Sequence, residues 1–170
     1  MPGENAARPR RCAVVGAGVL GACVAARLAE AGIGVTLLER AQPGHAATRS
    51  SFAWLNANDK APRAYHDLNH AGMRAWAGLS ASRVVRGLQD ADVAGYRVCV
   101  RPMPVDGQSI VGWLPGAGGL YVAVTHSGVT LAAHLAKLIT TELVSGAPAA
   151  ELAPYRPHRF AATTPAPGHS

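Results

Sequence analysis

The sequence contains no uninterrupted run of about 20 apolar residues, so nothing in it predicts a helix that spans a membrane. Lysine is scarce, with 2 Lys beside 14 Arg, and the net charge of +6 is spread along the chain. No basic stripe with interleaved aromatic residues is present, which argues against a nucleic-acid-binding surface. The three cysteines lie in apolar stretches. They predict core residues of a cytoplasmic protein, and neither a disulfide framework nor a metal site.

What the sequence does contain is a glycine motif directly after its first apolar run, residues 12–15. Gly16, Gly18 and Gly21 form the motif, and Glu39 ends the next apolar run 18 residues beyond Gly21. Glycine at these positions permits a tight turn, a close approach of the backbone to a pyrophosphate, and close packing of the following helix. Strand, glycine turn, helix, strand and acid in this order predict a dinucleotide-binding unit with a parallel sheet, in an α/β fold.

The acid at the end of the second strand is expected to accept hydrogen bonds from ribose hydroxyls. Glu39 would repel a 2′-phosphate, although Arg40 beside it is a cation. One alternative is a secretory signal, because the basic residues from Arg8 to Arg11 precede an uncharged stretch over 12–26. A secretory signal requires neither the three glycines nor the acid, whereas the nucleotide unit requires both.

Further helices and strands are expected along the rest of the chain. Apolar residues at helical spacing predict a helix over about 64–79, and alternation predicts a strand over 96–101. Short apolar runs at 110–111 and 120–124 predict two more strands. A helix opens at 126–130, and the free N–H groups at its start form a second place that can stabilise negative charge.

The domain organisation follows from these elements. At 170 residues the chain is long enough for one domain but not for two. We expect a basic flexible N-terminus (1–10), one nucleotide-binding domain (11–160) and a disordered tail rich in Ala, Thr and Pro (161–170). The domain divides into an N-terminal half (11–79), a junction without periodic signal (80–95) and a C-terminal half (96–160).

Two blocks of sequence resemble the FAD-dependent D-amino acid oxidase family, which includes glycine and sarcosine oxidases and D-amino acid dehydrogenases. The first block runs through SFAWLNANDKAPRAYHDLNHAGMRAW, and the second contains RPMPVDG followed by GLYVAVTHSGVTLA. The resemblance extends over most of residues 12–160. The second block is far more specific than the glycine motif.

The resemblance implies a Rossmann-like FAD-binding domain and an oxidoreductase acting on the C–N bond of a small amino acid or amine by hydride transfer. The glycines would bind the FAD pyrophosphate and Glu39 the adenosine ribose, and Arg101 matches the arginine that pairs with the substrate carboxylate. The start of the second helix would lie beneath the flavin pyrimidine. The implied cofactor-binding residues are Gly16, Gly18, Val19, Leu20, Gly21, Glu39, Arg40, Thr48, Arg49, Ser50, Ser127, Gly128, Val129 and Thr130.

His126 belongs to the same motif but is not expected to be a base. In the family, an amine deprotonated in solution gives hydride directly to the flavin, so no protein base is required. We therefore interpret His126 as a loop residue that holds the turn.

The chain also departs from the family, whose members are much longer. The missing length falls between about Leu79 and Tyr96 and comprises a strand against the cofactor and most of the substrate domain. Three hypotheses stay open: a working flavoenzyme, an FAD-binding module completed by a partner or a second copy, and a non-catalytic remnant. The substrate, the electron acceptor and the oligomeric state are not determined by the sequence.

Overall fold

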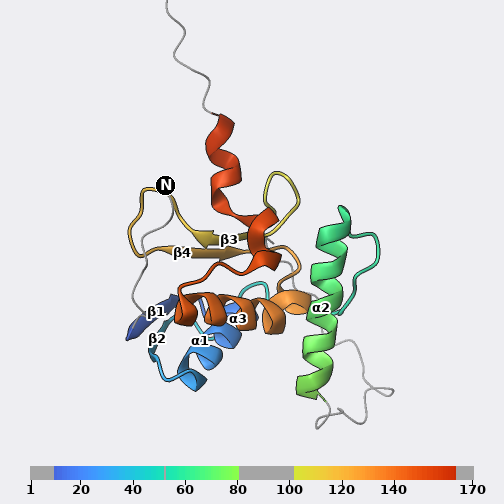
Figure 1. Cartoon of the computed structure of the whole chain (residues 1–170). Coiled ribbons are helices and arrows are strands. Elements are labelled where there is room, and N and C mark those ends of the chain that lie inside the picture. The colour runs from blue at the N-terminus through green and yellow to red at the C-terminus, as the bar shows by residue number, and fades with distance from the viewer. Residues whose placement is uncertain (1–9, 52, 81–101, 164–170) are drawn as a thin grey trace, which may run out of the picture.

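The computed structural model describes residues 10–51, 53–80 and 102–163. Within these residues it is a mixed α/β structure with several helices and two separate two-stranded sheets (Figure 1). The elements are β1 (Arg11–Val15), α1 (Val19–Glu30), β2 (Gly34–Leu38), α2 (Arg63–Ser80), β3 (Ile110–Trp113), β4 (Tyr121–Val124), α3 (Gly128–Ser145) and the 3₁₀ helices η1 (Ala150–Tyr155) and η2 (Pro157–Thr163).

The first three elements form a β-α-β unit with parallel strands. β1 pairs with β2 in a register that runs from Arg11 opposite Gly34 to Val15 opposite Leu38. α1 ends where Gly32 takes a φ of +79°, which lets the chain turn directly into β2. The predicted parallel sheet and Rossmann-like start are therefore confirmed.

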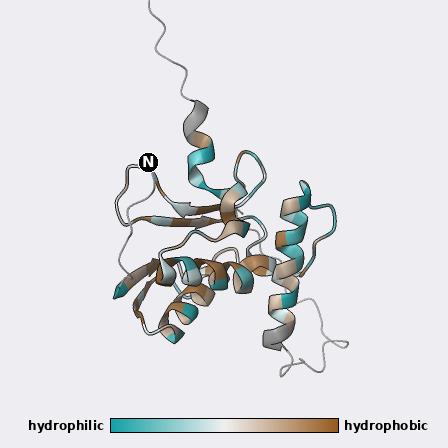
Figure 2. Ribbon diagram, in the orientation of Figure 1, coloured by the Kyte–Doolittle hydropathy of each residue, from teal (hydrophilic) through white to brown (hydrophobic). Residues whose placement is uncertain are grey.

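α1 and α3 pack against each other and form the centre of the core. Leu28 of α1 and Leu131, Leu135 and Ile139 of α3 are all at most 2% exposed. Figure 2 shows the apolar residues of these two helices gathered where the helices meet. The α3 helix ends at Gly146, whose φ of +70° gives the left-handed cap that glycine favours.

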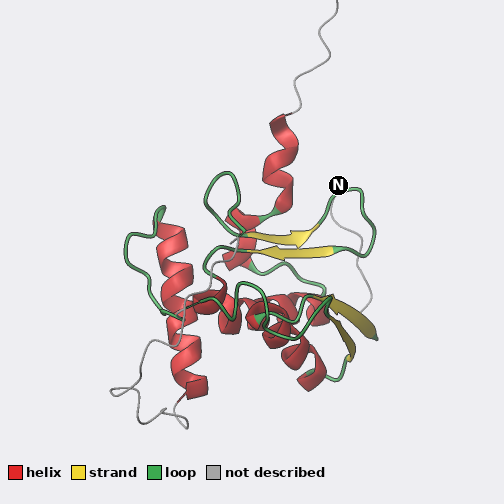
Figure 3. Ribbon diagram, turned by 180° about the vertical axis from the view of Figure 1, so that it is seen from behind, coloured by secondary structure: helices red, strands yellow, loops and turns green. Residues whose placement is uncertain are grey.

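β3 and β4 form an antiparallel hairpin that lies over α3 (Figure 3). At the closed end of the hairpin, the N–H of Leu114 donates to the carbonyl of Leu120. The rings of Trp113 and Tyr121 meet edge to face. Val111, a residue of β3, is fully buried. The two predicted strands at 110–111 and 120–124 are present, with β4 beginning at Tyr121.

The C-terminal segment is tied to this half by an ion pair. The guanidinium of Arg156 donates two hydrogen bonds, of 2.9 and 2.8 Å, to the two carboxylate oxygens of Glu142. Both side chains are nearly buried, with 12% and 6% of their surfaces exposed. The 3₁₀ helices η1 and η2, which periodicity did not predict, lie on either side of Arg156 in the chain. η2 runs through Thr163, three residues into the segment that was expected to be disordered.

Several sequence-based expectations lie outside the described residues. They are the strand at 96–101 with Arg101 and Cys99, the junction after Ser80, residues 1–9 of the basic N-terminus, and the tail from 164 onward.

Candidate functional site

The glycine turn between β1 and α1 has a geometry that only glycine accommodates. Gly16 has a φ of +99°, in the left-handed region. A Cβ atom at Gly21 would lie 1.9 Å from the carbonyl oxygen of Gly16, so any side chain there would push the helix away from the turn. These contacts keep α1 close to the end of β1.

The start of α1 presents backbone donors that are available to an anion. Within the described part of the chain, the N–H groups of Gly18, Leu20 and Gly21 have no hydrogen-bond partner. The first turn of α1 also contains no acidic residue. Unpaired N–H groups at the positive end of a helix dipole bind phosphate groups. This helix start therefore fits a pyrophosphate.

The loop after β2 folds back over the turn. The hydroxyl of Thr48 accepts a 2.9 Å hydrogen bond from the N–H of Val19, and the N–H of Gly44 donates to the carbonyl of Ala17. A Cβ atom at Gly18 would lie 3.2 Å from the Thr48 hydroxyl oxygen. Thr48 thus accepts from one of the N–H donors at the start of α1. The loop leaves less space around the other donors.

Glu39 lies against the same turn. Its carboxylate accepts hydrogen bonds from the N–H groups of Ala17 (2.8 Å) and Ala41 (3.2 Å). The bond from Ala17, followed by that from Ala41, lowers the pKa of Glu39 below its ordinary value. A carboxylate has about four lone-pair positions, so two remain for ribose hydroxyls.

One cavity, with a volume of about 1330 Å³, lies between the β-α-β unit and the C-terminal half. The glycine turn and β1 form one side, and β4 with the first turn of α3 forms another. Leu28, Ile139 and Leu143 contribute apolar lining from the two central helices. The predicted cofactor-binding residues that line it are Gly16, Gly18, Val19, Leu20, Gly21, Thr48, Ser50, Ser127, Gly128, Val129 and Thr130.

Three predicted cofactor residues do not line this cavity. Glu39 contacts the turn through the Ala17 N–H, Arg40 follows Glu39 in the chain, and Arg49 has its guanidinium beside the ring of His45. Arg101 lies outside the described residues.

The first turn of α3 is the second helix start at the cavity. It has no acidic residue, and the N–H groups of Gly128, Val129 and Thr130 have no partner among the residues that the structure describes. Thr125 supports this start, because its hydroxyl oxygen accepts from the Ser127 N–H (3.1 Å) and from the Ser109 hydroxyl (2.9 Å). The predicted anion-stabilising helix start is therefore open toward the cavity.

Sequence reasoning missed the residues that hold this helix start from behind. Tyr65 hydrogen-bonds to the side chains of His126 and Ser127, and the indole N–H of Trp76 donates to the carbonyl of Val129. In the sequence, both aromatic residues belong to the apolar pattern that predicts the helix over about 64–79. Their polar atoms carry no periodic signal that would have distinguished them from core residues.

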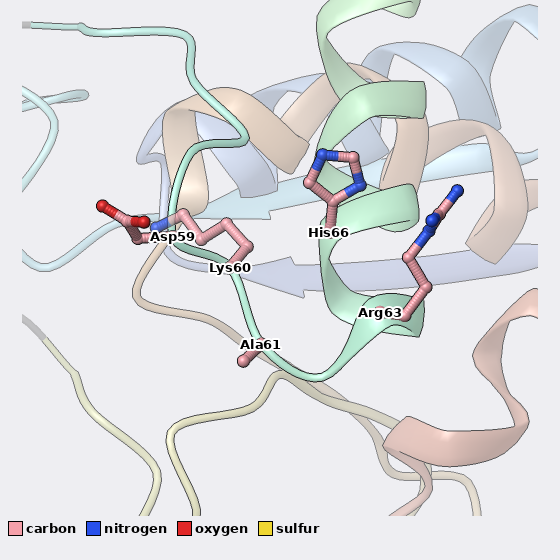
Figure 4. Close-up of a pocket in the computed structure, with 5 residues that line it drawn as sticks. All are labelled: Asp59, Lys60, Ala61, Arg63 and His66. Carbon is pink, nitrogen blue, oxygen red and sulfur yellow. The ribbon is translucent and has the colours of Figure 1, made fainter.

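A second, smaller hollow of about 500 Å³ lies at the start of α2. It is lined by Asp59, Lys60, Ala61, Arg63 and His66 (Figure 4). Arg63 and His66 contact the carboxylate of Asp67, and Figure 4 shows Lys60 and Asp59 directed away from them. The charged groups do not converge on one point, so this hollow forms no site.

The sequence around this site is similar to that of a known protein family. Residues 11–87 match the model of the DAO family, the FAD-dependent oxidoreductases. This family is FAD-dependent, so the match supports FAD as the cofactor and a general FAD-dependent oxidoreductase as the class of protein. The matched segment, a little under half of the chain, contains the glycine turn, Glu39, Thr48 and α2. No curated protein matched the chain closely enough to count as a relative.

The donor set around the cavity fits FAD. Two helix starts face the cavity, one with the turn that pyrophosphate requires and one beside the apolar wall that a flavin ring requires. Among the described residues no helix is long and apolar enough to cross a membrane. Over the same residues, no group of three His, Cys, Asp or Glu side chains could hold a metal ion.

Proposed function

We propose that this protein is an FAD-dependent oxidoreductase that oxidises the C–N bond of a small amino acid or amine. The observation that carries the proposal is the convergence on one cavity of two helix starts with unpaired N–H donors, those of α1 at Val19 and of α3 at Gly128. Electrostatic stabilisation by such preorganised donors requires no reorganisation when charge develops. The match of residues 11–87 to the FAD-dependent family supports the same conclusion.

The residues of the chain would divide the binding between them. The N–H groups of Gly18, Leu20 and Gly21 would hold the pyrophosphate, and Glu39 would accept from the ribose. The first turn of α3 would direct N–H groups at the pyrimidine side of the ring. When bound, FAD supplies the acceptor for the hydride that leaves the substrate carbon while the amine nitrogen loses a proton.

Substrate positioning would depend on Arg101, as the family resemblance implies. An arginine binds a carboxylate through two parallel charge-assisted hydrogen bonds, which fixes the orientation of the neighbouring carbon. The substrate class in this proposal is therefore an amino acid with a free carboxylate, such as glycine, sarcosine or a D-amino acid. Oxygen or another acceptor would remove the electrons afterwards.

The first experiment is a visible absorption spectrum of the purified, desalted protein, before and after anaerobic addition of D-amino acids, glycine and sarcosine. Oxidised flavin bands that bleach on addition support both the cofactor and the reaction. Flavin bands that persist with every amine contradict the proposed reaction. The protein would then be an FAD-binding module without this activity. A protein that stays colourless after incubation with FAD contradicts the proposal as a whole.

A matched pair of glycine variants locates the binding site. Gly18→Val would place a side chain against the Thr48 hydroxyl and over the helix-start donors, so we expect loss of flavin retention. Gly118→Val is the control, because a Cβ at Gly118 meets no atom within 4 Å and the residue does not line the cavity. Full flavin content in Gly18→Val would show that the cofactor binds elsewhere.

A further inference from the structure

α2 contacts the first turn of α3 along one helical face. Tyr65, Gly72 and Trp76 lie on this face, at spacings of seven and four residues that return to the same side of a helix. A Cβ atom at Gly72 would lie 2.4 Å from the carbonyl oxygen of Thr130, and the Trp76 indole donates to Val129 at 2.7 Å. Figure 1 shows α2 crossing beside the beginning of α3. The first turn of α3, which lines the cavity, is therefore held by α2. No described residue of α2 itself lines the cavity.

Tyr65 makes the contact nearest to the cavity. Its hydroxyl oxygen lies 3.0 Å from the hydroxyl oxygen of Ser127 and 3.1 Å from Nε2 of His126. The Tyr65 residue is 2% exposed and is not part of the cavity lining. Any effect of Tyr65 on a bound ligand must therefore pass through Ser127 or His126, both of which line the cavity.

The hydrogen-bond network determines which way the Tyr65 proton points. Nε2 of His126 lies 2.9 Å from the carbonyl oxygen of Gly107, and a carbonyl only accepts, so this nitrogen carries a proton. Nε2 then cannot accept from Tyr65. The Tyr65 hydroxyl donates to Ser127 instead.

This arrangement leaves the Ser127 hydroxyl as a donor. Its oxygen accepts from Tyr65, so its own proton points elsewhere. The Nδ1 atom of His126, at 3.4 Å, is beyond the usual distance for a hydroxyl donor. Ser127 lies in the cavity wall at the start of α3, so its proton is available to a ligand acceptor there.

We infer that Tyr65 is a positioning residue that orients the Ser127 hydroxyl as a hydrogen-bond donor to the flavin ring. The inference rests on the proposed function, since it assigns a partner to a group at the FAD site. A donor at this helix start stabilises negative charge on the ring, and a reduced ring carries more of it. Tyr65 therefore raises both the affinity for FAD and its midpoint potential.

The test compares four variants with the wild type. Tyr65→Phe removes the donor to Ser127, Ser127→Ala removes the hydroxyl, and the double variant removes both. Tyr155→Phe is the matched control, since the Tyr155 hydroxyl is equally buried but has no hydrogen-bond partner. The readouts are the dissociation constant of FAD by fluorescence titration, the midpoint potential of bound FAD, and the melting temperature of the apoprotein.

We expect Tyr65→Phe to weaken FAD binding about five-fold, the factor that one net hydrogen bond of about 1 kcal/mol represents, and to lower the midpoint potential. Ser127→Ala should change both quantities at least as much, and the double variant no further than Ser127→Ala. Tyr155→Phe should change neither quantity. Such non-additive changes in FAD affinity and potential would show that Tyr65 acts on the cofactor through Ser127.

The possible failures are distinguishable. Wild-type affinity and potential in Tyr65→Phe, or strictly additive effects in the double variant, overturn the inference and leave the FAD site in place. A change only in the apoprotein melting temperature assigns Tyr65 to stability alone and also overturns it. A wild-type protein that binds no FAD overturns the proposed function, and this inference with it.

Discussion

The strands in the two halves of the molecule differ in how completely their side chains are buried. In the N-terminal β-α-β unit, Val15 is 82% exposed and Leu38 is 48% exposed, although both lie on strands. In the C-terminal half, Val111 of β3 and Leu131 of α3 are fully buried, and an ion pair secures the end of the chain. Neither β1 nor β2 contains a buried residue, whereas β3 contains two, so the strands beside the glycine turn are the less completely buried. We therefore expect a ligand in the cavity to stabilise the N-terminal unit more than the C-terminal half.

The largest effect is expected from breaking the ion pair of the C-terminal half. Arg156→Leu leaves the carboxylate of Glu142 buried without its bidentate partner. Removal of one member of a buried pair costs about 3–5 kcal/mol of unfolding free energy. Urea denaturation of the apoprotein measures this loss.

The control for Arg156→Leu is a double variant that also carries Glu142→Leu. Replacing both members by apolar residues removes the unpaired buried charge and should recover much of the lost stability. A single variant as stable as the wild type would show that the C-terminal half does not depend on this pair.

The next effect is the response to FAD itself. At a free concentration 100 times the dissociation constant, a ligand specific for the native state contributes about 2.7 kcal/mol. Amide hydrogen exchange should show the added protection concentrated over residues 16–48 and the first turn of α3. Uniform protection, or protection limited to η1 and η2, would contradict the comparison between the halves.

A smaller effect is expected from the acid at the glycine turn. Glu39→Gln keeps the side-chain shape but removes the charge that accepts from Ala17 and Ala41 and, in the proposed site, would accept from the ribose. Because a charge-assisted hydrogen bond is stronger than a neutral one, loss of the charge should weaken FAD binding. Fluorescence titration measures this change in affinity. Glu30→Gln is the control, because Glu30 is exposed on α1 and, among the residues described, pairs with Arg27 alone.

The smallest effect is a pH dependence from the C-terminal half. Hydrogen bonds from Arg159 hold the pKa of Asp106 below its ordinary value of 3.8. A carboxyl with a lowered pKa stabilises the folded state fully above its ordinary value, and this contribution is lost as the pH falls through the lowered pKa. Asp106→Asn should therefore flatten the acid limb of the stability curve below about pH 4, as melting curves would show. An unchanged acid limb would assign the acid sensitivity to other carboxyl groups.

Local patterns predicted much of the fold. The glycine spacing and the two apolar runs predicted β1, α1 and β2, and apolar periodicity predicted α2 and α3. η1 and η2 were not predicted, because Arg156 stabilises them through Glu142, 14 residues earlier in the chain. A contact of this kind leaves no period in the sequence.

The candidate site was predicted in its parts but not in its arrangement. The sequence identified Gly16, Gly18 and Gly21, and the resemblance identified the start of α3. It did not indicate that Thr48 would reach the start of α1, or that Arg49 would lie beside His45 outside the cavity. Such placements depend on how a loop folds, and loop composition alone does not determine that.

The sequence by itself determined the β-α-β unit and the glycine turn, because strand, turn and helix preferences act between residues close together along the chain. Only the tertiary structure decided that two helix starts face one cavity and that Tyr65 holds one of them through Ser127. These residues are 62 positions apart. Their contact exists because α2 packs across α3, and packing between distant segments is governed by the shape of the whole core and not by any local pattern.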